Sequence, residues 1–181
     1  THPRPADIRA IGVGLIDRDP TLRPNYVTNR TERGDFNAAR ANSLGVSPEE
    51  RPWLFVIKKN KTVLRQVLNW IENHVADAQE VGSGRPVVDR LPLLVIDDEA
   101  DHASVDTGEQ VFDEDGQPDE DHSPSAINKG IRRILHAFRR SAYVGYTATP
   151  FANIFIHERG ETKLESLDLF PSSFIVNLAA P

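Results

Sequence analysis

The sequence predicts an α/β fold with a mostly parallel sheet flanked by helices. Two short apolar runs, at residues 93–96 and 143–146, have the length of buried strands and lead into polar motifs. Each run follows a segment in which apolar residues recur at the spacing of an amphipathic helix. Strand and helix therefore alternate along the chain, which is typical of parallel sheets with helices packed on both faces.

Composition narrows the class of protein. The length of 181 residues suits one domain with an added subdomain. No apolar run approaches the roughly 18 residues of a membrane span, and the N-terminal residues lack the pattern of a secretory signal. The chain has no Cys, which excludes disulfides and thiolate zinc sites, so we expect a cytoplasmic protein. It also has no Met, so we expect a piece of a longer protein.

Charge is distributed unevenly along the chain. The formal net charge is −6, yet residues 97–121 contain twelve acids and no Lys or Arg. The remaining residues contain fifteen acids and twenty-one bases. A modestly basic body beside an acidic loop is compatible with nucleic-acid contact, and equally with an ordinary solvated surface.

Residues 1–52 are predicted to form an irregular N-terminal segment, with a strand over 8–16 and a short helix near 36–43. The main domain is expected over residues 53–181. It opens with an apolar run at 53–57, which predicts a buried strand. Three basic residues follow at the C-terminal end of this strand: Lys58, Lys59 and Lys61. They would either contact a nucleic-acid backbone or lie on solvated surface.

An amphipathic helix of about four turns is predicted next, because apolar residues recur three and four positions apart. Its apolar residues are Val63, Leu64, Val67, Leu68, Ile71 and Val75. Gly82 and Gly84 are expected to close it. The strand at 93–96, expected to be buried and central, completes a first β-α-β unit.

A second unit follows a long acidic loop over residues 103–123. Its helix begins near residue 123, with an apolar stripe of Ile127, Ile131, Ile134, Leu135 and Phe138. The strand at 143–146 completes the unit. Further apolar segments lie at 151–156, expected as a short strand or helix, and at 167–178.

The acidic residues after the 93–96 strand are suited to phosphate chemistry. One carboxylate can hold Mg²⁺, which prefers hard oxygen ligands and keeps several waters. The next carboxylate can orient and deprotonate an attacking water. Two assignments are open: Asp98 as the metal ligand with Glu99 as the base, which we prefer, or Asp97 as the ligand with Asp98 as the base.

Hydroxyl groups stand at the end of the neighbouring predicted strand, on Thr147 and Thr149. Because parallel strands end at the same edge of a sheet, we expect them to lie near the acidic residues. They are suitable partners for Asp101 or His102.

Two motifs in this region resemble those of known motors. Asp-Glu-Ala-Asp-His at 98–102 resembles motif II of superfamily-two helicases and translocases, and Thr-Ala-Thr-Pro at 147–150 resembles their motif III. The finer detail resembles the Z-one domain family, helicase-like proteins described as endonucleases and found near bacterial restriction and phage-defence genes. The sequences that carry this likeness lie at 56–60, 95–104, 145–153 and 169–175. The resemblance covers roughly residues 53–181.

The resemblance implies a partial RecA-like domain in an ATP-dependent motor that acts on DNA. Asp98 would hold Mg²⁺, Glu99 would be the base, and Asp101, Thr147 and Thr149 would couple hydrolysis to movement. Mg²⁺ and ATP are the cofactors expected of the full-length protein, and DNA and other restriction or defence subunits are its expected partners, with no membrane.

The sequence departs from such motors in three respects, of which the first is the additional Asp that leaves the two assignments above open. It contains no Gly-x-x-x-x-Gly-Lys-Ser/Thr phosphate loop, and the second motor domain with its arginine finger is also absent. In the resembling motors the loop precedes motif II, so we expect it upstream of Thr1. We therefore expect this chain alone to bind nucleotide poorly, if at all, and to be inactive.

Other functions use the same residues. A metal-dependent endonuclease would bind one or two metal ions through Asp97, Asp98, Glu99, Asp101 and His102. The Glu-x-Lys pattern of restriction-type nuclease cores is missing near the 143–146 strand. A response-regulator receiver would need an Asp within residues 135–145, where there is none. The remaining alternatives are a non-catalytic interaction module and a capped strand end that leads into a solvated loop.

Overall fold

The computed structural model describes residues 24–28, 35–43, 48–101, 124–148, 169 and 173–177. The strand expected over 8–16, the acidic loop, the 151–156 segment and most of 167–178 lie outside these residues. The chain divides into two compact units, Thr1–Lys58 and Lys59–Pro181. Each unit is described by itself.

The first unit contains a small parallel pair of strands. β1 (Asn25–Tyr26) pairs with β2 (Trp53–Leu54), with Asn25 opposite Trp53. The predicted buried strand over 53–57 is therefore only two residues long, and it does not belong to the sheet that contains residues 93–96. The ladder ends because the hydroxyl of Thr28 accepts the N–H of Val56 at 2.8 Å, and Val56 is exposed.

The short helix predicted near 36–43 is confirmed as α2 (Ala38–Ser43). Asn37 caps its start, with its side-chain oxygen accepting the N–H of Arg40 at 3.1 Å. The core of this unit contains Val27, Phe36 and Ala41. The ring of Phe36 packs near that of Phe55, with a centroid separation of 6.0 Å.

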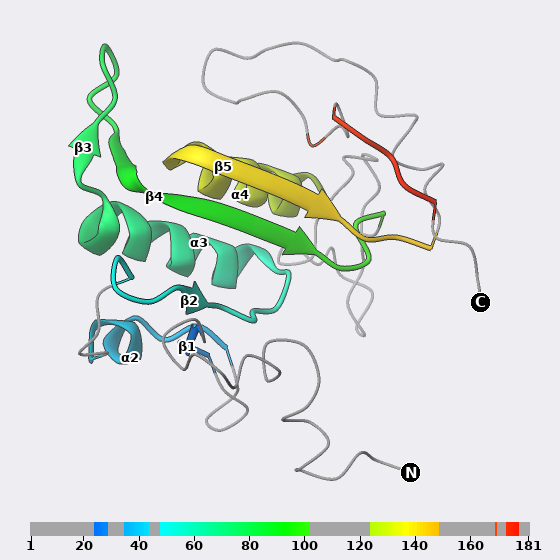
Figure 1. Cartoon of the computed structure of the whole chain (residues 1–181), viewed down its shortest axis with the longest axis horizontal. Helices are drawn as coiled ribbons and strands as arrows, with labels where there is room; N and C mark the ends of the chain where they lie inside the picture. The colour runs from blue at the N-terminus through cyan, green and yellow to red at the C-terminus, as the bar shows by residue number, and fades with distance from the viewer. Residues whose placement is uncertain are drawn as a thin grey trace, which may run out of the picture. The chain divides into compact units, whose positions relative to one another are not determined.

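The second unit contains a mixed sheet of three strands flanked by helices, in the order β3 (Ala78–Gln79), β4 (Pro86–Asp97) and β5 (Phe138–Gly145). β4 and β5 are parallel and run side by side (Figure 1), whereas β3 is antiparallel to β4. The predicted α/β class is confirmed, and the unpredicted β3 makes the sheet mixed. β4 lies between β3 and β5 in the strand order, but β3 pairs only with Pro86 and Val87, so among the described residues the predicted strand at 93–96 pairs with β5 alone. Gly82 and Gly84, with φ angles of 95° and 69°, lie in the turn between β3 and β4 instead of closing the preceding helix.

The two predicted helices of this unit form as α3 (Lys61–Trp70) and α4 (Pro124–His136). α3 continues into a π-helical turn, η3 (Ile71–Val75), so the predicted length of about four turns is confirmed, whereas the helix ends at Val75 and not at Gly82 and Gly84. The two helices pack closely: a Cβ added to Gly130 of α4 would lie 3.0 Å from Leu64 Cδ1 of α3.

Most of the predicted apolar residues of the two helices are buried. They include Val63, Leu64, Val67, Leu68, Ile71, Ile127, Ile131 and Ile134. Phe138, which was expected in the helical stripe, is instead the first residue of β5. Ala137 separates the two elements, and its carbonyl accepts the N–H of Val88 at 2.8 Å, so the chain leaves the helix directly into strand pairing.

The C-terminal half of β4 is covered on one face only, among the residues that the structure describes. Leu94 and Ile96 are 59% and 62% exposed, whereas Asp97 on the opposite face is 5% exposed. Side chains of a strand alternate between faces, so the α3–α4 layer lies on the face of Asp97. The expectation of a strand buried on both faces, between two helical layers, is therefore not met in this part of the chain.

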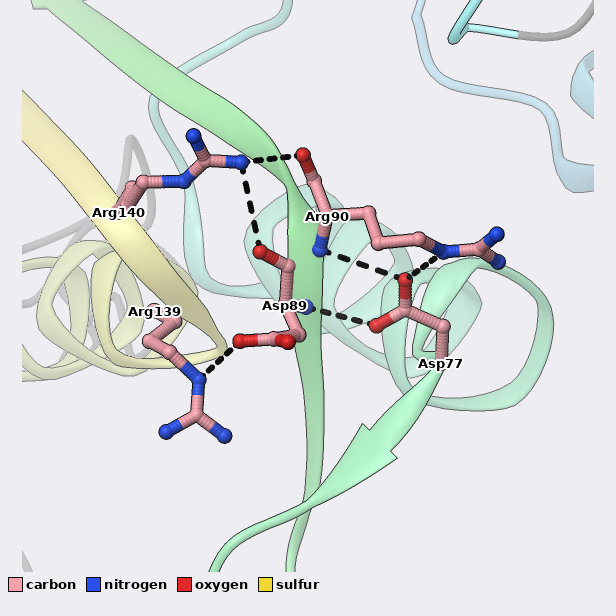
Figure 2. Close-up of polar contacts among 5 residues, drawn as sticks. All are labelled: Asp77, Asp89, Arg90, Arg139 and Arg140. Atoms are coloured by element: carbon pink, nitrogen blue, oxygen red, sulfur yellow. Dashed lines mark hydrogen bonds and ion pairs between the residues drawn. The ribbon is translucent and has the colours of Figure 1, made fainter.

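A bulge in β4 sets the register of the parallel pair. Residues 89–91 lie between two paired positions of β4, where β5 has only Arg139. Asp77, which precedes β3, replaces part of the lost strand pairing: its Oδ1 accepts the N–H of Asp89 at 2.7 Å. Its Oδ2 accepts from Arg90, at 3.4 Å from the backbone N–H and 2.7 Å from Nε (Figure 2).

Side chains from β5 bind the other side of the bulge, as Figure 2 shows. Arg140 donates to the carbonyl oxygens of Asp89 and Arg90, and Arg139 pairs with the Asp89 carboxylate. The N–H of Asp89 and, after it, the guanidinium of Arg90 hold the pKa of Asp77 below its ordinary value. This network fixes the pairing that continues to the C-terminal ends of both strands.

In the part of the chain that the structure describes, the helices are too short or too polar to cross a membrane.

Candidate functional site

The C-terminal ends of β4 and β5 bring together the described parts of the two predicted motifs, residues 98–101 and 147–148. Asp97 is paired with Gly145, and the N–H of Tyr146 donates to the Asp97 carbonyl at 2.8 Å. The residues after β4 form a turn over 98–101, called here the acidic turn. The N–H of Ala100, within this turn, donates to the Tyr146 carbonyl at 2.8 Å. The expectation that these two strand ends are neighbours is confirmed.

Small residues allow the acidic turn to fold back against β5. Ala100 is buried, and a Cβ added to Gly145 would lie 2.9 Å from the Ala100 Cβ. Real Cβ atoms do not approach this closely, so glycine at 145 is a requirement of this packing. The turn is thus held against the neighbouring strand by backbone hydrogen bonds and by close packing together.

Asp97 is the anchor of the site. Its carboxylate is buried, and its Oδ1 accepts from Lys59 Nζ at 2.9 Å. Its Oδ2 accepts from the hydroxyl of Tyr143 at 2.7 Å. An ion pair and a hydrogen bond compensate the desolvation of this buried charge.

Lys59 binds more than the Asp97 carboxylate. Its ammonium also donates to the carbonyl oxygens of Asp98 and Glu99, at 2.9 and 2.8 Å. Three oxygen acceptors from three consecutive residues therefore surround one cation, whose side chain is 24% exposed. We call Lys59, Asp97 and Tyr143 the lysine latch.

Asp98 and Glu99, the two residues held by the latch, have exposed side chains. Asp98 Oδ1 accepts the N–H of Glu99 at 3.1 Å. Glu99 has a φ of 53°, in the left-handed region that residues with a Cβ seldom adopt. Glu99 therefore carries backbone strain at the end of β4.

The other predicted site residues divide into described and undescribed ones. Asp101 closes the acidic turn and Thr147 follows β5, and both are half-buried. His102 and Thr149 lie outside the described residues. Among the predicted nucleic-acid contacts, Lys58 is exposed and its backbone N–H donates to Asp35 at 3.0 Å.

Two features of the site were missed by the sequence analysis. The first is Lys59, for which only contact with nucleic acid or a place on the solvated surface was considered. The same prediction was made for Lys61, which is the first residue of α3. Tyr143 was read only as part of a strand. One signal could have identified Tyr143. It lies two residues before Gly145, which is paired with Asp97, so the side chains of Tyr143 and Asp97 lie on the same face of the sheet.

The residues present fit one part of a Mg²⁺ site. Asp98 offers an exposed carboxylate at a strand end, whereas both oxygens of Asp97 already accept hydrogen bonds. Within the described ranges, no group of three His, Cys, Asp or Glu residues is placed to hold a metal ion. Mg²⁺ bound through one carboxylate, waters and substrate phosphates needs no such group.

Comparison of the chain with protein-family models, with curated protein sequences and with solved structures gives no match.

Proposed function

We propose that this chain carries the hydrolysis half of an NTP-dependent DNA translocase or helicase-like motor, within a RecA-like domain of a restriction or phage-defence system. The observation that carries the proposal is the acidic turn itself. It presents Asp98 and Glu99 at the C-terminal end of a parallel strand and is hydrogen-bonded to the strand that leads into Thr147. Open α/β sheets bind their ligands at this edge.

Glu99 is the proposed catalytic base. The attacking water loses a proton to its carboxylate as the water oxygen bonds to the terminal phosphorus. The bond between that phosphorus and the leaving nucleoside diphosphate breaks in the same displacement. Because the side chain is exposed at the turn, it can reach a water outside the protein surface.

Asp98 is the proposed ligand of Mg²⁺, which would neutralise charge on the phosphates when bound. Asp97 is the less suitable ligand, because Lys59 and Tyr143 occupy its two oxygens. This supports Asp98 as the ligand and Glu99 as the base, over the assignment shifted by one residue. Asp101, Thr147 and Thr149 would couple hydrolysis to movement.

The cradle for the phosphates is expected outside this sequence, since no phosphate loop occurs within it. DNA contact is proposed for Lys58, whose side chain is exposed, whereas Lys61 is half-buried and the ammonium of Lys59 binds three oxygens inside the protein. Steering and binding of the DNA backbone need such cations at an exposed surface.

The proposal is tested by nucleotide turnover in a longer chain that includes the phosphate loop. Glu99→Gln is expected to abolish turnover and to leave nucleotide binding intact, because the amide keeps the shape and loses the basic oxygen. Unchanged turnover would refute the motor assignment. Cleavage of plasmid DNA by this chain with Mg²⁺ or Mn²⁺ alone would favour the endonuclease. If variants of the acidic turn change neither nucleotide turnover nor DNA cleavage, a non-catalytic module is favoured.

A further inference from the structure

We propose that Lys59 is a positioning residue, which sets the geometry of the acidic turn through the lysine latch. This inference rests on the proposed function, because the groups that the latch would aim are Asp98 and Glu99. Lys59 lies far from them in sequence, at the entrance to α3. Its ammonium joins it to the turn through three contacts.

The convergence of oxygens explains why a cation is needed at this point. The carbonyls of Asp98 and Glu99 and the Oδ1 of Asp97 all lie 2.8–2.9 Å from Lys59 Nζ. Three oxygens directed at one point repel each other unless a positive charge lies between them. The two carbonyls belong to the residues proposed as ligand and base, so the ammonium fixes the peptide groups that orient both side chains.

Within the latch, Lys59 and Tyr143 together keep the Asp97 carboxylate from moving toward a ligand. Tyr143 holds Oδ2 from β5 while Lys59 holds Oδ1 from the helical layer. Asp97 is therefore the structural anchor of the turn, and its charge serves to hold Lys59.

The backbone beside Lys59 is itself rigid. Asn60 caps α3, with its Oδ1 accepting the N–H of Val63 at 2.8 Å. The cap fixes the backbone from which the Lys59 side chain leaves, and sites supported in this way hold their geometry well. The latch thus connects the residue before the cap of α3 with the ends of β4 and β5.

Hydrogen exchange in this chain tests the latch without any activity. Lys59→Met keeps the aliphatic stem and removes the charge, and Lys129→Met is the matched control on the exposed surface of α4. The amides of Ala100 and Tyr146, whose hydrogen bonds join the ends of β4 and β5, are expected to exchange roughly ten- to hundredfold faster in Lys59→Met. The Val88 amide, bonded to Ala137 at the opposite end of β4, should keep its rate.

The exchange pattern separates positioning from general stability. An equal acceleration at Ala100, Tyr146 and Val88, or no acceleration at Ala100, would overturn the proposal. If Lys59→Met does not fold, Tyr143→Phe removes one hydroxyl from the same latch. It is expected to accelerate exchange at the same two amides, by a smaller factor of roughly three to ten, and unchanged rates there would equally overturn the latch.

Kinetics then connect the latch with the site. In the longer chain with its phosphate loop, Lys59→Met is expected to lower kcat about 100-fold, since small misplacements of reacting groups have effects of this size. The Mg²⁺ concentration for half-maximal rate should also rise in Lys59→Met, because the latch orients Asp98 as well as Glu99. Asp98→Asn, which removes the proposed ligand itself, should raise it further. If Lys59→Met keeps the full kcat and Glu99→Gln has no turnover, the positioning role of Lys59 is refuted and the motor assignment is kept. Unchanged turnover in both variants would instead sink the motor assignment.

Discussion

The left-handed backbone of Glu99 allows stability and activity to be separated at one residue. Glu99 has a φ of 53° and an exposed side chain in the acidic turn. Asparagine adopts this conformation much more readily than other residues with a Cβ, because its short amide bonds to the nearby backbone. Glu99→Asn should therefore stabilise the fold and remove the proposed base.

The size of the stabilisation follows from the backbone conformation. A left-handed residue with a Cβ costs about 1–2 kcal/mol relative to the right-handed region. If asparagine removes about half of this cost, the unfolding free energy rises by about 0.5–1 kcal/mol. For a chain of this length, such a change raises Tm by roughly 1–4 °C.

Thermal unfolding of three proteins measures this effect. The wild type is compared with Glu99→Asn and with Glu99→Gln, which keeps the length of the side chain and the same backbone cost. We expect a higher Tm for Glu99→Asn only. A Tm for Glu99→Asn at or below that of Glu99→Gln would refute the argument, because Glu99 would then stabilise the turn.

Three further predictions concern the framework around the site. Gly145→Ala should destabilise the fold by about 1–3 kcal/mol in urea unfolding, because its Cβ would meet Ala100, and adding Ala100→Gly should restore most of the loss; no recovery in the double variant would contradict this packing. The pKa of Asp77 is lowered in the folded state, so its stabilising effect is complete above about pH 4 and is lost as the pH falls through the pKa of the folded state. The free energies of urea unfolding of wild type and Asp77→Asn should therefore differ near pH 6 and converge in strong acid. A difference that grows in acid would count against the network at the bulge. Asn60→Ala should cost about 1 kcal/mol by removing the cap of α3, with Arg65→Ala on its exposed face as the control, and equal unfolding midpoints would argue against the cap.

The helices of the second unit were predictable because burial imposes a period on sequence. The spacing of Val63 and Val67, and of Ile127 and Ile131, locates α3 and α4 within a few residues. Ends were harder to place. Phe138 fits the helical period but begins β5, since the apolar pattern does not record where strand pairing begins.

Short strands left no signal in the sequence. β3 has only two residues and forms through its hairpin with β4, so it is too short to show the alternating hydrophobic pattern of a strand. The strand expected over 53–57 reads as buried from its composition alone. It extends for only two residues, because the hydroxyl of Thr28 ends the ladder at Val56.

The parts of the candidate site that are contiguous in the sequence could be predicted. The acidic residues and the Thr-Ala-Thr-Pro segment each follow an apolar run, and the parallel pairing of those runs makes their ends neighbours. The lysine latch was not predictable in this way. Lys59 lies 38 positions from Asp97, and in sequence it resembles any other lysine after a strand.

The most direct test of the proposed function is turnover of ATP by Glu99→Gln in a longer chain that includes the phosphate loop. Phosphate release and nucleotide affinity are measured together, with the wild type as reference. The account predicts that turnover falls at least about 100-fold, the contribution expected of a general base, while the affinity for ATP stays within about twofold. Turnover equal to that of the wild type would contradict it.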